Sequence, residues 1–153
     1  MARLPDVRTI GVPSLEKLPD RLPHVRQYFS LLVAWNAPDQ LSVNDAAALR
    51  RLVDSGLIYF CAWGKNCERV HDAVDRFDID RPTKVDHIIM TTWHSRKSLG
   101  EAMWFFRYCV CPADPLQSVA FDRFAVSIGR SGWHKSMAQY FGRKRATSKA
   151  TRD

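Results

Sequence analysis

Residues 57–72 read LIYFCAWGKNCERVHD, an apolar run, a glycine turn and the start of an amphipathic segment. The run from Leu57 to Trp63 is apolar at every position, which is typical of a strand buried on both faces of a parallel sheet. Asn66 is a favourable N-cap for a helix whose buried stripe begins at Val70. The stretch therefore predicts a strand, a tight turn and a helix, which is the repeating unit of an α/β fold.

Three tryptophans end three predicted strands at a nearly constant interval. Trp35 ends the predicted strand that starts at Arg26, and Trp93 ends the predicted strand that starts at Val85. They lie 28 residues before and 30 residues after Trp63, which is the length of one strand–helix unit. Because the units share little else, the interval indicates repeated βα units and not a solenoid.

Helices are expected between these strands. Ser42 with Asp45, and Ser98 with Glu101, have the spacing of capping boxes, which mark helix starts. The remaining elements are expected as helices over 42–56, 67–77, 101–111 and 134–141, with a fourth strand over 123–128. The alternation predicts a small three-layer α/β domain, Rossmann-like or flavodoxin-like, with about four mainly parallel strands. With right-handed crossovers we favour the strand order 2-1-3-4.

The chain is expected to hold one α/β domain at residues 25–142, flanked by two segments of different composition. Residues 1–24 contain four prolines and predict an extended arm that covers a sheet edge or pairs with a partner. Residues 143–153 carry five Lys/Arg against one Asp and predict a disordered basic tail. Because the tail carries much of the net charge of +7, nucleic-acid binding is expected only through the tail.

The composition, with 46% hydrophobic and 25% charged residues among 153, is that of a soluble single domain. No secretory signal is visible, and no stretch approaches the roughly 20 apolar residues that a membrane helix needs. The chain is therefore expected in a reducing cytoplasm with free thiols. The four cysteines are Cys61, Cys67, Cys109 and Cys111, and the last two are expected to be structural.

A binding site is expected outside the carboxyl ends of the strands, where ligands bind in open α/β sheets. In the favoured order the crevice lies between the first and third strands. The candidate ligand-binding residues are Trp35, Asn36, Trp63, Gly64, Asn66, Trp93 and His94. The alternative is that the strand-end tryptophans close off the core, with their indole N–H groups bonded to loop carbonyls.

Cys67 and His71 are the strongest candidates for nucleophilic chemistry. At positions i and i+4 they share a helix face, and the first turn of a helix lowers a thiol pKa. No G-x-S-x-G elbow or phosphatase loop accompanies them, so a small buried thiol is the alternative. Together with His94 they could also ligate zinc, with Cys61 or a water as fourth ligand. No paired zinc motif is present, and no cofactor is favoured.

Three further features could contact a ligand. Glu101 completes its capping box or stabilises an oxocarbenium-like state in glycosidic-bond chemistry. The turns at residues 64–66 and 129–132, Gly-Lys-Asn and Gly-Arg-Ser-Gly, are small and basic, and either could receive a phosphate on backbone N–H groups or serve only as a turn.

Three blocks, FCAWGKNCERVHD, IIMTTWHS and SLGEAMWFF, resemble those of a family of small bacterial proteins of unknown function. The resemblance covers roughly residues 28–130. It implies a Rossmann-like domain in a bacterial or phage cytoplasm, and it implies no activity and no catalytic residue.

Two hypotheses follow. The first is a non-enzymatic accessory or regulatory domain that binds a ligand or protein at the C-terminal strand edge. Its partner would be a protein or a second copy, docked on the apolar helix from Glu101 to Cys111 or on the N-terminal arm. A small nucleotide-like ligand is also possible. The second is a hydrolase or glycosidase-like enzyme for a nucleotide-type substrate, with Cys67, His71, His94 or Glu101 as catalytic candidates.

Overall fold

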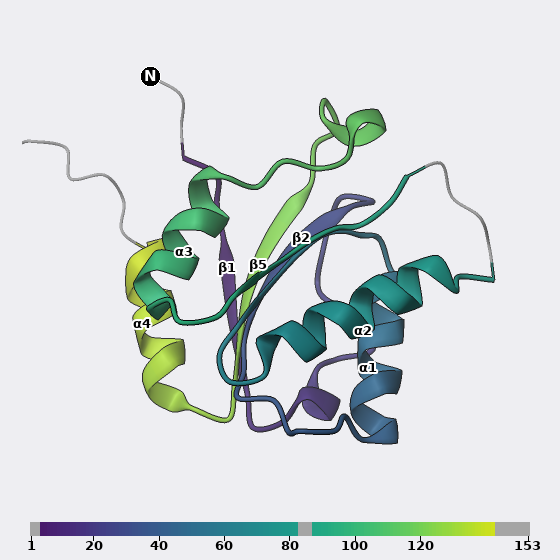
Figure 1. The fold of residues 1–153 in the computed structure, drawn as a ribbon. Coiled ribbons are helices and arrows are strands. Elements are labelled where there is room, and N and C mark those ends of the chain that lie inside the picture. The colour runs from purple at the N-terminus through teal and green to yellow at the C-terminus, as the bar shows by residue number, and fades with distance from the viewer. Residues whose placement is uncertain (1–3, 83–86, 143–153) are drawn as a thin grey trace, which may run out of the picture.

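A computed structural model describes residues 4–82 and 87–142 as one five-stranded parallel sheet with helices on both faces (Figure 1). The strands are β1 Arg8–Val12, β2 Phe29–Ala34, β3 Leu57–Trp63, β4 Met90–His94 and β5 Asp122–Ile128. The helices are α1 Val43–Asp54, α2 Cys67–Ile79, α3 Leu99–Tyr108 and α4 Ser131–Gly142, with 3-10 turns at Leu15–Lys17 and Asp114–Leu116. The α/β class and the three layers are thus confirmed.

The strand order is β1-β5-β2-β3-β4, which differs from the order expected from the sequence. In the numbering of the four expected strands it reads 4-1-2-3, so the expected first and third strands are not neighbours. The additional strand, β1, comes from the expected proline-rich arm and pairs with β5. The arm thus covers a sheet edge by adding a strand to it, while the tail at 143–153 lies outside the described residues.

The helices divide evenly between the two faces of the sheet. α1 and α2 cover one face, where they pack on side chains such as Leu31 and Val33 of β2. α3 and α4 cover the other face, where they pack on Leu32 and Ala34. Successive residues of a strand point to opposite faces, so a strand covered on both sides is mainly apolar on both faces. This explains why all six residues of β2 are buried.

Both predicted capping boxes are present. Ser42 Oγ accepts a hydrogen bond from the backbone N–H of Asp45 at 3.0 Å, and Ser98 Oγ accepts one from Glu101 at 3.1 Å. The helix expected over 101–111 ends earlier, at Tyr108. Cys109 is its C-cap residue and Cys111 lies beyond it, because the chain turns away before Pro112.

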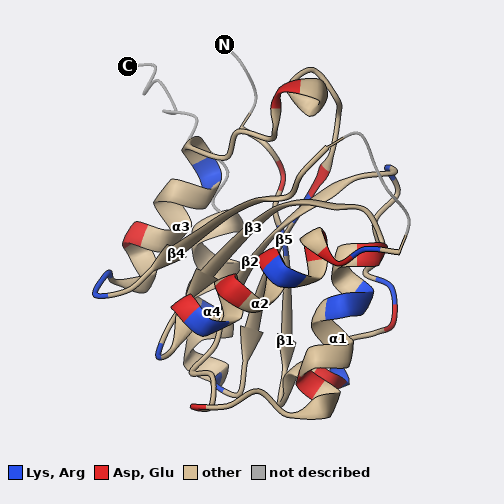
Figure 2. Cartoon of the chain, turned by 45° about the vertical axis from the view of Figure 1, so that its right-hand side comes forward, with Lys and Arg blue, Asp and Glu red and all other residues tan. Residues whose placement is uncertain are grey.

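β4 is an edge strand and is less buried than the sequence suggests. The expected core residues Ile88 and Met90 are 63% and 37% exposed, and only Ile89 between them is buried. The expected strand start at Val85 lies outside the described residues. Acidic and basic positions lie side by side along α2, while the middle of the sheet carries no charge (Figure 2). Over the described ranges, every helix is too short or too polar to cross a bilayer.

Candidate functional site

The carboxyl ends of the five parallel strands form one edge of the sheet, and the loops that leave this edge carry most of the candidate residues. Two neighbouring loops, after β2 and after β3, are joined by backbone hydrogen bonds. Trp35 N–H donates to the carbonyl of Trp63 at 2.9 Å, and Ala37 N–H donates to that of Lys65 at 2.9 Å. Asn36 Oδ1 accepts from the N–H of Lys65 at 2.9 Å. The amide of Asn36 therefore binds a loop and not an open space.

Gly64 makes this close approach possible. Its φ is +115°, and a Cβ at this position would lie 2.2 Å from the carbonyl oxygen of Trp35. Glycine avoids both the strain and the collision because it has no Cβ. The role of Gly64 is thus to let the two loops touch.

Asn66 precedes α2, as expected, but it does not cap the helix with its side chain. It adopts a left-handed conformation with φ 59°, and its side chain makes no capping hydrogen bond. Its Nδ2 instead donates to the carbonyl of Ala37 at 2.9 Å and to Asp39 Oδ1 at 3.1 Å. The expected cap is therefore wrong in its contacts, because the amide is used to hold the neighbouring loop.

Cys67 begins α2, but its thiol is buried, with 2% of the residue exposed. Burial raises the pKa of this thiol above its ordinary value, although the backbone N–H groups of His94, Cys67 and Glu68 lower it in part. A nucleophilic cysteine requires the opposite shift, because the thiolate is the reactive form. These surroundings suit a small buried thiol.

His71 is held between α2 and β4. Its Nδ1 lies 2.9 Å from Asp72 Oδ1, and its Nε2 lies 2.9 Å from the hydroxyl of Thr91, which donates to Asp75 Oδ1 at 2.6 Å. The ring packs against Trp93 with centroids 4.5 Å apart. Both ring nitrogens thus have partners, and the cluster fastens α2 to the edge strand.

His71 and His94 lie on opposite faces of β4. Thr91 and Trp93, which contact His71, alternate along the strand with Thr92 and His94, and alternate residues point to opposite faces. His94 packs on Phe105 of α3, at 4.6 Å between ring centroids. In residues 4–82 and 87–142 there is no group of three or more His, Cys, Asp or Glu able to hold a metal. The zinc hypothesis therefore lacks a ligand set there.

His94 and Glu101 do come together, in a cleft of about 540 Å³ beside α3. Its other lining residues are Lys97, Ser98, Gly100, Trp104 and Phe105. Burial, followed by the charge of Lys97, lowers the pKa of His94, while the backbone N–H of Ser98 lowers the pKa of Glu101. Glycosidases commonly use two carboxylates, and among the described residues Glu101 is the one carboxylate that lines this cleft.

The three strand-end tryptophans have different surroundings. The Nε1 of Trp63 donates to the carbonyl of Lys97 at 2.7 Å, and its ring meets Trp133 edge-on at 5.1 Å. Trp35 is partly buried against the core, whereas Trp93 is 44% exposed. Trp63 therefore fits the expectation that an indole closes the core, and Trp35 lines a hollow described next.

The strand order reverses between β2 and β5, because β3 and β4 follow on one side of β2 and β5 lies on the other. Two hollows of about 350 and 300 Å³ open there and share Pro13, Gly129 and Arg130; we call them together the switch-point hollow. Its other lining residues include Ser14, Trp35, Asn36, Ser131, Trp133 and His134. The crevice expected between the first and third strands does not form, because β3 and not the expected third strand pairs with β2.

The switch-point hollow presents unpaired polar groups. Arg130 is exposed, its Cζ lies 5.4 Å from the centre of the Trp133 ring, and no carboxylate among the described residues pairs with it. The first turn of α4 holds no acidic residue. His134 Nδ1 is buried and has no hydrogen-bond partner in the part of the chain described. The hollow therefore offers a cation, an unpaired ring nitrogen and two indoles, and its one carboxylate among the described lining residues, Asp45, is engaged in the capping box with Ser42.

Ser14, Trp133 and His134 were not among the residues expected at the site. The turn Gly129-Arg130-Ser131-Gly132 was recognised as a basic strand-end turn, but the favoured strand order placed it away from Trp35. The small, basic turn could therefore be recognised in the sequence. Its position beside Trp35 could not, because that depends on β5 being a neighbour of β2.

Of the comparisons with known proteins, one matches the chain, and it covers the whole described fold. No curated protein and no solved structure matches the chain. The model of a domain of unknown function, DUF7684, matches residues 7–144. This match starts just before β1 and includes all five strands and all four helices. The chain therefore belongs to the DUF7684 family, a family of unknown function.

Proposed function

We propose that this protein binds a phosphate-bearing, nucleotide-like ligand in the switch-point hollow, without transforming it. The observation that carries the proposal is the exposed guanidinium of Arg130, which has no carboxylate partner among the described residues and lies at the reversal of strand order. Ligands of open α/β sheets bind at this position. An arginine that is not paired internally can form two parallel hydrogen bonds with a phosphate.

The start of α4 also favours a negatively charged ligand. No acceptor among the described residues binds the backbone N–H of Ser131 or Gly132. Such groups at a helix start carry partial positive charge and favour an anion. The nearby indoles of Trp35 and Trp133 offer flat apolar surface to a ring. A phosphate with an attached aromatic ring therefore matches both parts of the hollow.

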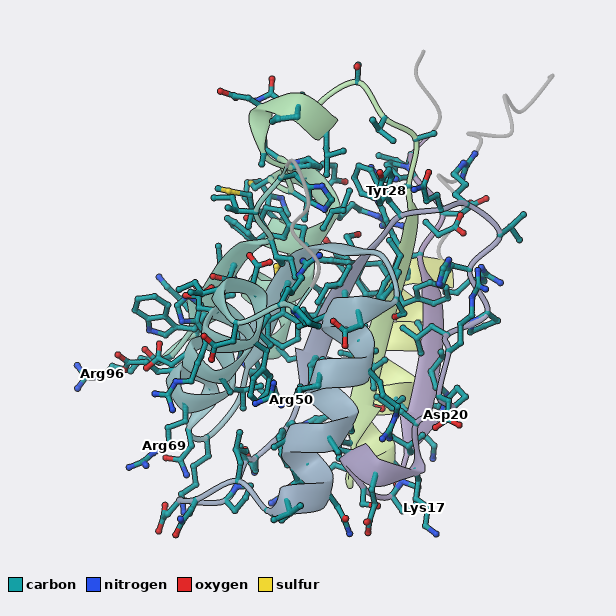
Figure 3. The ribbon with its side chains drawn as sticks, turned by 90° about the vertical axis from the view of Figure 1, so that its right-hand side faces the viewer. Lys17, Asp20, Tyr28, Arg50, Arg69 and Arg96 are labelled. Carbon is teal, nitrogen blue, oxygen red and sulfur yellow. The ribbon has the colours of Figure 1, made fainter. Side chains whose placement is uncertain are left out.

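Calorimetric titration of the full chain with adenosine 5′-monophosphate tests this function. We expect binding, and we expect Arg130→Gln to weaken it about tenfold or more, since hydrogen bonds to charged groups contribute about 1.5–3 kcal/mol. Adenosine, which lacks the phosphate, should bind far less. Arg69→Gln is the matched control, because Arg69 is an exposed arginine of α2 whose side chain points away from the body of the molecule (Figure 3).

Two outcomes would contradict the proposal. One is the absence of heat from the nucleotide at millimolar concentration. The other is an equal loss of affinity in the Arg130 and Arg69 variants, because that result would mean that only the overall charge matters.

A further inference from the structure

Another cavity, of about 840 Å³, lies at the opposite edge of the sheet, where β1 and β5 begin. Three arginines line it, Arg8, Arg26 and Arg123, together with two carboxylates, Asp6 and Asp122. Its size is within the range of small-molecule sites. Among these described lining residues the positive charges exceed the negative ones by one, which favours a ligand that carries negative charge.

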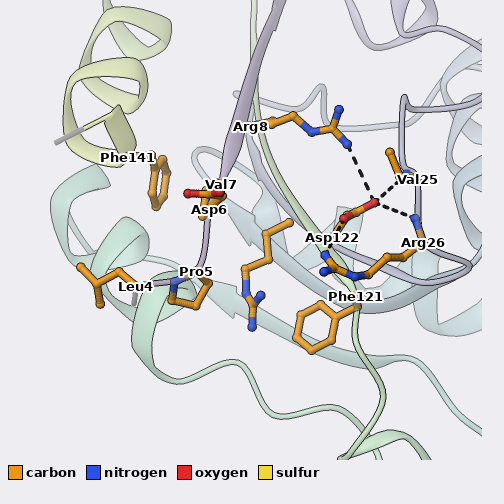
Figure 4. A pocket seen from close by; sticks show the side chains of 11 residues that line it. Leu4, Pro5, Asp6, Val7, Arg8, Val25, Arg26, Phe121, Asp122 and Phe141 are labelled. Carbon is orange, nitrogen blue, oxygen red and sulfur yellow. Dashed lines mark hydrogen bonds and ion pairs between the residues drawn. The ribbon is translucent and has the colours of Figure 1, made fainter. Parts of the chain in front are cut away.

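Asp122 organises one wall of this cavity (Figure 4). Its Oδ2 accepts hydrogen bonds from the backbone N–H groups of Val25 at 2.7 Å and Arg26 at 3.0 Å, and its Oδ1 accepts from Arg26 Nη1 at 3.1 Å. Arg8 Nη2 lies 3.8 Å from the same carboxylate and donates to the carbonyl of Pro23 at 2.6 Å. Asp122 is thus already supplied with donors, and Arg8 and Arg26 are fixed in place by these contacts.

Arg123, the third arginine of the cavity, takes no part in these contacts with Asp122. Its guanidinium carbon lies 4.2 Å from the centre of the Phe121 ring, which positions the side chain without using its N–H donors. Its Nε is buried without a hydrogen-bond partner, and no carboxylate pairs with it, within residues 4–82 and 87–142. Burial, followed by the charge of Arg26, lowers its pKa. The site therefore holds a partly buried cation that an anion would stabilise.

Part of the cavity lining is apolar. Leu4, Pro5 and Val7 contribute partly buried aliphatic surface from the segment that leads into β1, whereas Phe121 and Phe141 line the cavity but are buried in the core. A bare inorganic ion would leave this surface exposed to water. An anion with an apolar ring would cover it, which is favourable in proportion to the area removed from water.

We propose that this cavity binds a small organic anion, a carboxylate or phosphate carried on an apolar body such as an aromatic ring, with the fork of Arg123 on the anionic group and the aliphatic surface of Leu4, Pro5 and Val7 against that body. Arginine suits either headgroup, because its planar donors match both geometries. The site is separate from the switch-point hollow, so the two proposals can succeed or fail independently.

The test is a ¹H–¹⁵N NMR titration of the full chain with phenyl phosphate and, separately, benzoate, with phenol as the neutral control. We expect at least one of the two anions to shift the amide signals of Val7, Arg8 and Asp122, and phenol to leave them unchanged. The anion that binds more tightly identifies the preferred headgroup. Arg123→Gln should weaken its binding about tenfold or more, since it removes a charged hydrogen-bond donor, while Arg69→Gln should not.

Arg123→Lys separates the loss of the fork from a failure to fold. It keeps the charge and the aliphatic stem, so a folded Arg123→Lys protein with clearly weakened binding supports the proposal even if Arg123→Gln unfolds. The proposal is overturned if neither anion shifts the cavity signals, if both Arg123 variants bind as well as the original chain, or if the shifts appear only at Gly129 to Gly132. The last result would support the switch-point hollow instead.

Discussion

The middle strand, β2, pairs in parallel with β3 on one side and with β5 on the other. The loops that follow these two pairs of strands differ in how they contact each other. Beyond β2 and β3, the loops are joined by the hydrogen bonds of Trp35, Asn36 and Asn66. Beyond β2 and β5, the loops separate and leave the switch-point hollow. The hollow is therefore produced mainly by the chain topology and not by any particular side chain.

The cause is the direction in which each chain leaves the sheet. The segments after β2 and β3 lead to α1 and α2, which cover the same face, so their loops run side by side. The segment after β5 leads to α4 on the opposite face. Two loops that turn away from each other cannot bond, and this is why open α/β sheets have their binding crevice at such a point.

Of the changes considered, Gly64→Ala is expected to destabilise the protein most, because it separates the joined loops after β2 and β3. The left-handed conformation and the collision with the Trp35 carbonyl should together lower the free energy of unfolding by about 3 kcal/mol. Urea denaturation followed by circular dichroism measures this. Gly132→Ala is the control at the open side, where no atom lies within 4 Å of an added Cβ. In the helix it should be neutral or stabilise by up to about 1 kcal/mol. Equal effects at the two glycines would contradict the comparison.

Asn66 allows a smaller and more selective change on the same side. Asn66→Gly keeps the left-handed backbone and loses only the bonds to Ala37 and Asp39, so it should cost about 1 kcal/mol of unfolding free energy. Asn66→Ala also adds backbone strain at φ 59° and should cost about 2–3 kcal/mol. The same urea experiment measures both. If alanine were no worse than glycine, the conformation of Asn66 would have no energetic role.

Local sequence signals predicted the elements well. Leu57–Trp63 is the strand expected from its continuous apolar run, and both capping boxes form where Ser42 and Ser98 indicated. These features depend on residues a few positions apart, so the chain specifies them locally. The α/β class follows from the alternation of elements, and it did not require knowledge of the strand order.

Strand order and the site depended on contacts between distant residues. β1 is a short strand within a proline-rich segment, and Arg8 pairs in register with Phe124, near the other end of the chain. No local pattern distinguishes β5 or β4 as the second neighbour of β2. The crevice expected between the first and third strands does not form, because those strands are not neighbours, and Trp35 instead lines the hollow between β2 and β5.

The smallest expected effect is a shift in the reactivity of Cys67, at the end of the joined side. Burial raises its pKa, so its thiolate should form only above the pH at which an ordinary thiol, with a pKa of about 8.5, ionises. Iodoacetamide labelling across pH, read by mass spectrometry of each peptide, should modify the exposed Cys111 first and Cys67 at higher pH.

Cys111 is the internal reference in that experiment, because both thiols meet the same reagent in the same chain. A late reaction at Cys67 means that it is a shielded, structural thiol. If Cys67 instead reacted at a lower pH than Cys111, its thiolate would be stabilised by the start of α2. The nucleophile hypothesis for Cys67 and His71 would then gain support, and the joined pair of loops would become the place to look for catalysis.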